Sequence, residues 1–345
     1  MNPTYRSATD LGVELDRTLS SCVPSAETVA LVDFPNYPNV GDSAIWLGTM
    51  AALRRLGCRV AFTCDRRLYS RRALERRLPA GSPILLQGGG NFGDLWPEHQ
   101  LFRERVIADF PDRPIVQMPV SIAFQTASAE EQARATLQRH ERLTILCRDA
   151  GSRSYASENY RARVMLCPDA ALGLARRSRP RPTRDVTLLA RTDKEALEHL
   201  PQLPGVHAED WTSAPGEPGY RRWWERGVRL SQRLQRADAK RDWLRGTSQA
   251  ALRLLFRSLA RQRLEFGYQL VGSGRVLVTD RLHGHILALL LGVPHVVVET
   301  GYGKVRGFYE AFSRGFDRVL FCEHPREADA SVRVLLDELP AQEDR

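Results

Sequence analysis

The chain has 345 residues, of which 43% are hydrophobic and 26% are charged, and its formal net charge is +9. This composition excludes a disordered or fibrous chain and is typical of a soluble globular protein. The length predicts two domains, because single hydrophobic cores rarely extend beyond about 250–300 residues. Only three of the 50 basic residues are lysines. That bias is typical of a GC-rich genome, and a surface that contacts polyanions or acidic lipid is the alternative.

Cysteine usage and hydropathy predict the compartment. The six cysteines form no C-x-x-C pair and several lie in apolar, strand-like runs, which indicates reduced, buried thiols. The first 20 residues lack the apolar core of a signal peptide. The longest apolar stretch, 286–298, is interrupted by Gly292 and Pro294 and is too short for a membrane span of about 20 residues. We therefore expect a cytoplasmic protein, with peripheral contact at the inner membrane face left open.

The first half of the chain alternates between strand-like and helical patterns, which predicts a parallel sheet with helices on both faces. A helix is expected at 44–56, with Asp42 or Ser43 as its cap, and another at 130–139. The expected strands are 29–34, 59–64, 83–87, 115–118, 144–147 and 164–167.

A domain boundary is expected at 176–184, where two prolines and five arginines have the composition of a linker. The first domain then covers 1–175 and the second 185–320. The remaining segment, 321–345, is expected to be a C-terminal helix, for which packing back on the N-terminal domain is one arrangement. The second domain should contain a strand at 186–190, a long Arg-rich helical segment at 220–263, a strand–turn–helix–strand unit at 276–298, and helices at 305–312 and 328–339.

The segment V-T-D-R-L-H-G-H, residues 278–285, carries the strongest functional pattern. It places Arg281 and His283 between an apolar strand and an apolar run of helical length. In open α/β sheets this is where ligands bind, and the N–H groups of the helix favour an anion. An arginine and a histidine here predict an anionic substrate and a proton to move. The alternative for His283 is a structural role, and no metal site with His285 is expected.

Three consecutive glycines follow another strand, in G-G-G-N-F-G-D at 88–94. Glycines are costly in backbone entropy, so they indicate close backbone approach or positive φ. The loop is neither a P-loop nor a G-x-G-x-x-G fingerprint, so ATP or NAD chemistry is not supported. We interpret Gly89, Gly90 and Asn91 as substrate-binding, with an ordinary turn as the alternative.

Three more candidate residues lie at similar positions. Asp42, in N-V-G-D, opens a helix and is either a cap or a carboxylate that contacts substrate. Arg148 directly follows a strand, as Arg281 does, although a lone arginine is more often a surface residue. Lys304, in G-Y-G-K, leads from a strand into a helix, and its ammonium group suits a phosphate.

Together these motifs resemble a known family. N-V-G-D before a helix, G-G-G-N, C-R-D-A-G-S, P-D-A-A-L, and D-R-L-H-G-H-I-L-A-L-L-L-G-V-P followed by G-Y-G-K resemble the polysaccharide pyruvyl transferases in order and spacing. The resemblance extends over residues 29–312 and is weaker between 193 and 272. It implies an α/β, GT-B-like fold of two Rossmann-like domains that face each other across a cleft. It also implies that Arg281, Leu282, His283 and Arg148 contact phosphoenolpyruvate.

The reaction that this resemblance implies is pyruvate transfer from phosphoenolpyruvate to a sugar of an exopolysaccharide or cell-surface glycan, which forms a ketal and releases phosphate. Arg281, Arg148 and Lys304 would neutralise the donor anion, so no metal or other cofactor is required. His283 would protonate C3 of the donor, and Asp42 or Asp94 would accept the proton of a sugar hydroxyl. The expected partners are phosphoenolpyruvate and a sugar acceptor on a lipid-linked oligosaccharide, and no nucleic acid.

Two other functions remain open. A GT-B glycosyltransferase that uses a nucleotide sugar would share the architecture and basic site. A non-catalytic polyanion-binding protein would use the +9 charge but leave His283 and the glycine loop unexplained. The segment 220–263 contains Trp223, Trp224 and Trp243, and is either a solvated helix or a surface that meets anionic lipid.

Overall fold

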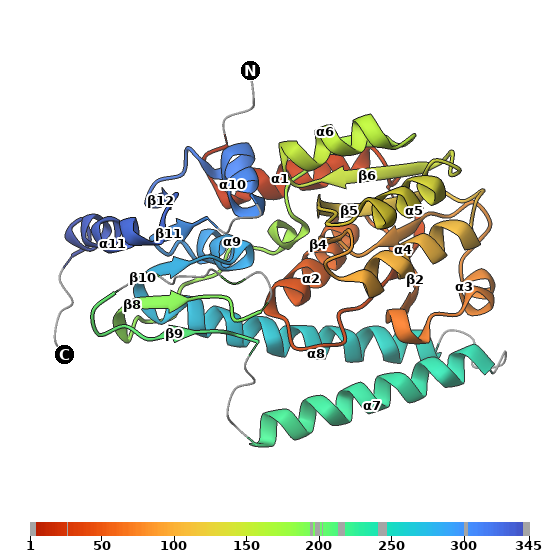
Figure 1. The fold of residues 1–345 in the computed structure, drawn as a ribbon. Helices are drawn as coiled ribbons and strands as arrows, with labels where there is room; N and C mark the ends of the chain where they lie inside the picture. The colour runs from red at the N-terminus through yellow and green to blue at the C-terminus, as the bar shows by residue number, and fades with distance from the viewer. Residues whose placement is uncertain are drawn as a thin grey trace. The chain divides into compact units, whose positions relative to one another are not determined.

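The computed structural model of the chain describes residues 5–25, 27–193, 196, 201, 203–212, 218–240, 247–299 and 303–340. The chain forms two compact units, each with its own parallel sheet, which confirms the expected α/β class (Figure 1). The seven-stranded unit comprises Gly12–Leu174 and Ala214–Arg263. The five-stranded unit comprises Met1–Leu11, Ala175–Ser213 and Leu264–Arg345.

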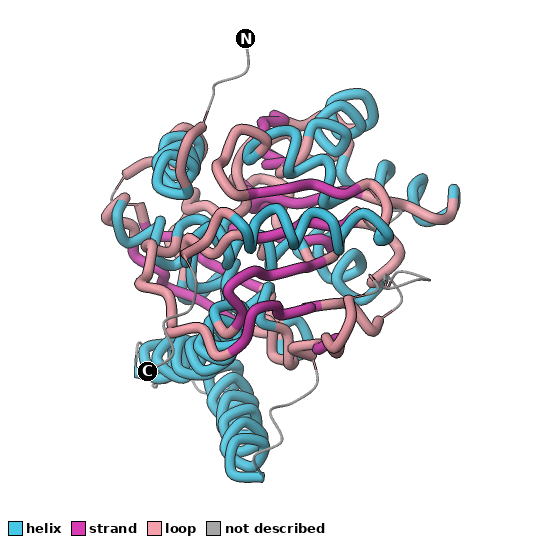
Figure 2. The backbone as a smooth tube through the Cα atoms, turned by 90° about the vertical axis from the view of Figure 1, so that its left-hand side faces the viewer, coloured by secondary structure: helices cyan, strands magenta, loops and turns pink. Residues whose placement is uncertain are grey.

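In the seven-stranded unit, the sheet has the order β2-β1-β3-β5-β6-β7, and β4 pairs with the end of β5. All pairs are parallel, and the central strands are apolar on both faces because helices cover both (Figures 1 and 2). The strands are β1 (Thr28–Val32), β2 (Arg59–Cys64), β3 (Ile84–Leu86), β4 (Gly89–Phe92), β5 (Ile115–Ile122), β6 (Leu143–Cys147) and β7 (Arg163–Leu166).

Several helices of this unit begin at a side chain that accepts backbone N–H groups. Asn39 caps α2, so the expectation of Asp42 or Ser43 as the cap was wrong. The Asn39 side chain accepts hydrogen bonds from the N–H groups of Gly41 and Asp42, and Ser43 instead donates its hydroxyl to the Asn39 carbonyl. The helices are α1 (Ala8–Ser20), α2 (Val40–Arg55), α3 (Arg71–Arg77), α4 (Pro97–Asp109), α5 (Ala127–Leu137) and α6 (Ala150–Asn159), with short turns η1 (Arg66–Leu68) and η2 (Ala170–Gly173).

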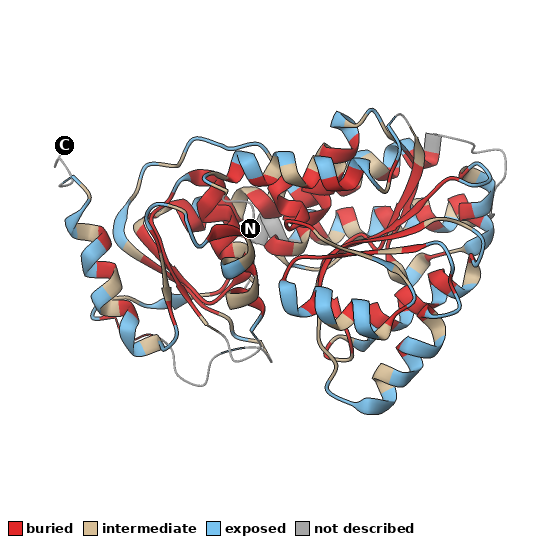
Figure 3. Ribbon diagram, turned by 90° about the horizontal axis from the view of Figure 1, so that it is seen from above, coloured by how far each residue is buried: buried red, intermediate tan, exposed pale blue. Residues whose placement is uncertain are grey.

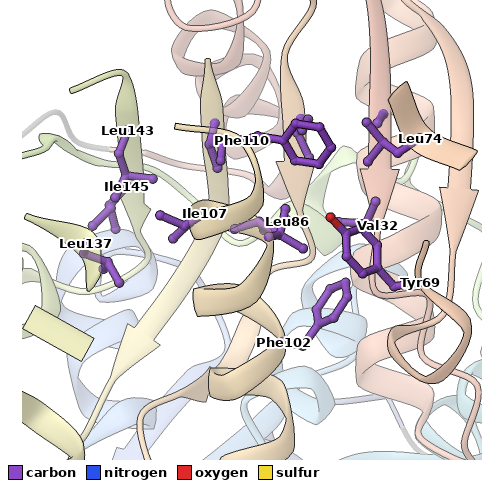
Figure 4. Packing of buried hydrophobic residues seen from close by; sticks show 14 of the residues in the cluster. Val32, Tyr69, Leu74, Leu86, Phe102, Ile107, Phe110, Leu137, Leu143 and Ile145 are labelled. Carbon is purple, nitrogen blue, oxygen red and sulfur yellow. The ribbon is translucent and has the colours of Figure 1, made fainter. Parts of the chain in front are cut away.

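The hydrophobic core of the seven-stranded unit includes side chains that the sheet and α3, α4 and α5 contribute. Val32 and Leu86 come from neighbouring strands, and Phe102 and Ile107 come from α4 (Figure 4). Strands β1 to β6 are mostly buried, whereas β7 at the edge of the sheet is not. Helix α2 is mostly buried, whereas α5 and α6 expose much of their surface (Figure 3). This core fixes the carboxyl ends of the strands, where the polar side chains described below lie.

The Arg-rich segment expected at 220–263 consists of two helices, α7 (Pro218–Lys240) and α8 (Thr247–Gly272), which lie side by side (Figures 1 and 2). Residues 214–263 belong to the seven-stranded unit, although the sequence interpretation placed them in the second domain. Trp224 is buried and Trp223 is exposed, whereas Trp243 lies outside the described residues.

The sheet of the five-stranded unit has the order β12-β11-β10-β8-β9, again all parallel. Its strands are β8 (Arg184–Leu189), β9 (Ala208–Glu209), β10 (Gly274–Thr279), β11 (His295–Val298) and β12 (Val319–Cys322). Its helices are α9 (Leu282–Leu291), α10 (Lys304–Phe308) and α11 (Ala328–Asp337), with shorter turns η3 (Tyr309–Ser313) and η4 (Pro325–Glu327).

The C-terminal helix α11 packs on β10, β11 and β12 of its own unit. Its Val332 and Leu335 join a core with Val276 and Val296, so the expected packing on the N-terminal domain was wrong. None of the six cysteines, all of which lie within the described residues, forms a disulfide; four are buried as expected, whereas Cys22 and Cys58 are half-buried. Among the described residues, no helix is long and apolar enough to cross a membrane.

Candidate active site

The turn between β10 and α9 holds the strongest candidate residues, as the sequence predicted. Arg281 is the N-cap residue of α9, and His283 lies in the first turn of the helix. Helix α9 begins earlier than its apolar run, so both side chains belong to the helix entrance. Thr279 fixes the turn, because its hydroxyl donates to the Leu189 carbonyl at 2.8 Å and accepts the Arg281 N–H at 3.1 Å.

The Arg281 side chain is buried and only 4% exposed. Its Nη2 donates to both carboxylate oxygens of Asp210, at 2.7 and 2.6 Å. Its guanidinium carbon lies 5.4 Å from the centre of the Trp211 ring, which is within cation–π range. Its buried Nε has no hydrogen-bond partner within the described part of the chain. An oxygen atom of an anionic ligand would satisfy this buried donor.

Asp210 is ionised to balance this guanidinium. Burial acts to raise its pKa, but the Arg281 cation and hydrogen bonds from Thr192 and Thr212 outweigh burial, so the pKa is lowered. Neighbouring Asp280 behaves in the opposite way, because burial raises its pKa to about 6 despite a hydrogen bond from the Arg191 N–H. The turn therefore combines one firmly ionised carboxylate with one that takes up a proton near neutral pH.

The other candidates of this unit differ in how far they are buried. Leu282 is buried and His283 is half-buried, so His283 has the more accessible side chain of the two. Lys304 is 9% exposed and begins α10, directly after Gly303, whose φ of 67° suits glycine. The preceding Gly301 and Tyr302 lie outside the described residues.

His285 has a structural role. Its Nδ1 lies 2.6 Å from Nε2 of His295, and its Nε2 lies 2.8 Å from Oγ of Ser313. Burial lowers the pKa of His285 well below its usual value and lowers that of His295 to about 4, so both rings are neutral. Because both ring nitrogens of His285 are engaged, it is not available to share a metal with His283.

The glycine segment forms strand β4 instead of an open loop. A Cβ at Gly88 would lie 2.6 Å from the Pro119 carbonyl oxygen, and a Cβ at Gly93 would lie 1.7 Å from that of Ala123. These two glycines are therefore explained by close packing against β5 and the segment that follows it. Gly89 differs, because its φ is 123° and a Cβ placed on it would lie 3.3 Å from Oδ1 of Asp42. The predicted substrate-binding residue Gly89 and the predicted catalytic residue Asp42 therefore lie together.

Asn91 faces the protein interior. Its Oδ1 accepts a hydrogen bond from Nη2 of Arg103 at 3.0 Å. Arg103 also donates to Gln117 and Gln100, both at 2.6 Å. Burial lowers the pKa of Arg103 to about 10. The side chains of Asn91, Gln100 and Gln117 thus bind the buried guanidinium group of Arg103 through uncharged oxygen acceptors.

Arg148 is likewise buried in the seven-stranded unit and 3% exposed. Its Nη1 donates to Asp169 at 2.6 Å, and its Nε donates to the Ser121 hydroxyl at 3.0 Å. The Ser121 hydroxyl in turn donates to Asp149, the N-cap of α6. The position after β6 was predicted correctly, and the side chain ties β5, β6 and η2 together.

The two candidate bases have different surroundings. Asp94 accepts three hydrogen bonds from Gln125 and Thr126, which engage both carboxylate oxygens, outweigh the effect of burial and lower its pKa. Asp42 is half-buried and accepts one hydrogen bond from the Tyr37 hydroxyl at 2.9 Å. Burial and the nearby carboxylates Asp42 and Asp33 raise the Tyr37 pKa well above its usual value, so this hydroxyl keeps its proton.

The sequence interpretation missed an Asp–His pair beside Tyr37. Asp33 directly follows β1, and its Oδ2 lies 2.7 Å from Nδ1 of His99 on α4. Both side chains are buried, and the Tyr37 and His99 rings are 5.8 Å apart. Asp33 has a φ of 70°, which is uncommon for a residue other than glycine, and such conformations cluster at functional sites.

This pair has the geometry of a base and its orienting carboxylate. When Asp33 accepts the Nδ1 proton, Nε2 of His99 keeps its lone pair, and no described residue hydrogen-bonds to that nitrogen. The sequence pattern places Asp33 inside an apolar strand, and an aspartate in such a run is the only signal that the sequence offers. His99 follows 66 positions later, so only the fold brings the two together.

Comparison with known proteins identifies the family to which the chain belongs. Residues 39–302 match the family described as polysaccharide pyruvyl transferase. The chain is 31% identical over 302 residues to pyruvyl transferase 1 of Schizosaccharomyces pombe, which covers 83% of this chain and 70% of that protein. It is 27% identical over 311 residues to the putative pyruvyl transferase EpsO of Bacillus subtilis, covering 89% and 92% of the two chains.

A solved structure supports the fold. An uncharacterized protein from Klebsiella pneumoniae aligns with a TM-score of 0.56 and 18% identity, covering 91% of this chain and 99% of that one. At that identity the likeness concerns the fold alone. The family match spans β10, the Arg281–His283 turn and the segment that begins α2, and from it we conclude that the chain belongs to the polysaccharide pyruvyl transferase family and is a transferase enzyme.

Proposed function

We propose that this enzyme transfers the pyruvyl group of phosphoenolpyruvate to two hydroxyls of one sugar in an exopolysaccharide or cell-surface glycan. The products are a pyruvate ketal and inorganic phosphate. The observation that carries the proposal is the turn after β10, where the buried Nε of Arg281 has no described hydrogen-bond partner. Membership of the family and the position of Arg281 at a helix N-terminus both support phosphoenolpyruvate as the donor.

Donor binding is assigned to the five-stranded unit. Arg281 binds the phosphoenolpyruvate anion through Nε while Asp210 holds its other side. Lys304 supplies a second positive charge, and Leu282 provides an apolar contact. His283, half-buried in the first turn of α9, donates a proton to C3 of the donor. Because side chains neutralise the anion, the proposed route uses no metal.

Acceptor deprotonation is assigned to the seven-stranded unit. His99, oriented by Asp33, takes the proton of the attacking sugar hydroxyl, a role that the sequence interpretation gave to Asp42 or Asp94. Asp42 and Gly89, which lie together, are assigned to binding of the sugar. The proposal also includes the predicted contact between Arg148 and phosphoenolpyruvate. The guanidinium group of Arg148 already donates hydrogen bonds to Asp169 and Ser121.

The proposed bond changes follow a fixed order. C3 gains a proton from His283, and the hydroxyl oxygen bonds to C2 as its proton passes to the base. The C2–O bond to phosphate then breaks and phosphate leaves. A second hydroxyl of the same sugar bonds to C2 and passes its proton to His283, which closes the ketal ring and restores the acid. The proton held by the base passes to the released phosphate.

Two variants test the donor site. Arg281→Lys keeps a positive charge beside Asp210 but loses the planar fork, so it should raise KM for phosphoenolpyruvate about tenfold and change kcat little. His283→Ala should lower kcat by roughly 10²–10⁴-fold. Phosphate release is measured with the glycoside, from a panel of simple sugars, that gives the fastest wild-type rate.

Thermal unfolding of each variant checks that the fold is retained. Full turnover by folded His283→Ala at saturating donor would contradict its role as the acid. Stabilisation of the wild-type protein by a nucleotide sugar, with none by phosphoenolpyruvate, would support the glycosyltransferase alternative instead.

A further inference from the structure

Helix α7 presents an outer face that the proposed reaction does not use. Within 222–239, the part of the helix whose side chains are described, every exposed residue lies on one side. We call this side the arginine face, and it consists of Arg222, Trp223, Arg226, Arg229, Leu230, Arg233 and Arg236. Five positive charges are therefore carried on one side of a single helix.

The opposite side of α7 anchors the helix to the seven-stranded unit through buried polar contacts. Gln235 accepts the Asp65 N–H and donates to the Asp65 carboxylate, both at 2.9 Å. Asp238 pairs with Arg77 of α3 at 2.5 Å. Gly227 packs against Leu259 of α8. The helix is thus attached by its inner side, which leaves the arginine face exposed.

The arginine face contains no acidic residue. Glu225, at its margin, lies 3.9 Å from Arg229, and Asp238 is buried on the inner side. Positive charge is therefore concentrated on this face, and it attracts a surface of negative charge.

Two large apolar side chains lie along one edge of the same face. Trp223 is 38% exposed and Leu230 is 48% exposed, and they are seven residues apart, which is two helical turns. An indole and a leucine beside arginines whose aliphatic stems are apolar match the boundary between lipid headgroups and acyl chains. A nucleic acid would bind the arginines through its phosphate charges, but it would leave the exposed Leu230 without a role.

We propose that the arginine face of α7 docks the enzyme on an anionic lipid bilayer. The five arginines lie among the headgroups, and Trp223 and Leu230 enter the outer part of the acyl region. Docking is parallel to the surface, because α7 is too polar to cross a bilayer. The inference goes beyond the proposed reaction and concerns where the enzyme works.

Vesicle flotation with the full chain tests this surface. Wild-type protein should float with phosphatidylcholine vesicles that contain about 30 mol% phosphatidylserine, an anionic lipid that attracts clustered basic residues. It should remain unbound with pure phosphatidylcholine. R226Q/R233Q should lower the partition coefficient roughly tenfold or more, since two surface cations are lost. Trp223→Ser should lower it at unchanged net charge.

The matched control is R139Q/R161Q, which removes the same charge from exposed positions outside α7. This control should bind vesicles as the wild type does, and all variants should release phosphate normally with a soluble acceptor. Equal flotation of wild type with both vesicle types, or equal loss in the control, would overturn the proposal. Unchanged vesicle binding by Trp223→Ser, with tight binding of wild type to a DNA duplex, would instead assign the face to nucleic acid.

Discussion

Asp33 combines an unfavourable backbone conformation with a side-chain contact to a candidate base. Its φ of 70° costs on the order of 1–3 kcal/mol for a residue other than glycine, and its carboxylate meets His99 at 2.7 Å. Its Oδ1 is buried without a hydrogen-bond partner among the described residues. A purely structural carboxylate would gain stability from additional partners, so this geometry favours a role in orienting the His99 ring.

His99→Gln tests this role at the residue scale. Glutamine keeps a polar side chain but cannot accept and carry a proton, so kcat should fall roughly 10²–10⁴-fold while binding of phosphoenolpyruvate is unchanged. Asp33→Asn should also lower kcat and should change its pH profile, because Asp33 acts through the imidazole. Donor binding is measured by calorimetry and turnover by phosphate release. Unaltered kcat in His99→Gln would return the base role to Asp42.

At the scale of elements, two glycines allow α2 and η2 to cross at very short range. A Cβ at Gly48 would lie 2.0 Å from the Ala170 carbonyl oxygen, and a Cβ at Gly173 would lie 2.3 Å from that of Gly48. The backbone of η2 cannot retreat easily, since Asp169 caps it and pairs with Arg148. This crossing helps to position the first turn of α2, where Asp42 lies.

Gly48→Ala should destabilise the protein by about 1–3 kcal/mol or more, because the new methyl group overlaps backbone atoms. Gly151→Ala is the matched control, since the nearest atom to its Cβ is 3.6 Å away and α6 is a regular helix. That variant should be neutral or stabilise by up to about 1 kcal/mol. Urea unfolding measures both, and equal stability of the two variants would show that the crossing relaxes.

At the scale of the whole molecule, the chain distributes the proposed chemistry over two compact units. The boundary near Leu174 lies close to the expected linker, but the chain returns to the seven-stranded unit for 214–263. Donor residues Arg281, His283 and Lys304 all belong to the five-stranded unit, and Asp33, Asp42 and His99 belong to the other. A ligand that occupies the donor site should therefore affect one unit first.

Hydrogen exchange of the whole protein with saturating phosphoenolpyruvate should show protection in the turn between β10 and α9. The expected segment is 279–285, because it contains the N-terminus of α9, where helix N–H groups favour an anion. Arg281→Lys should reduce this protection at equal donor concentration. Protection confined to β4 and α2, with none at the turn, would move the donor to the seven-stranded unit.

The sequence by itself determined the α/β class, most strand positions and the Arg281–His283 turn, because these follow from local hydrophobic patterns and from the rule for carboxyl ends of strands. It also carried the family motifs. Each of these properties depends on residues that are near one another in the chain.

Only the tertiary structure decided which side chains meet. It paired Arg281 with Asp210, which is 71 positions away, and Asp33 with His99, and it explained Gly88 and Gly93 by backbone packing. It also placed α7 with the seven-stranded unit and α11 on its own sheet. These contacts depend on strand order and helix packing over long sequence separations, for which local patterns contain no information.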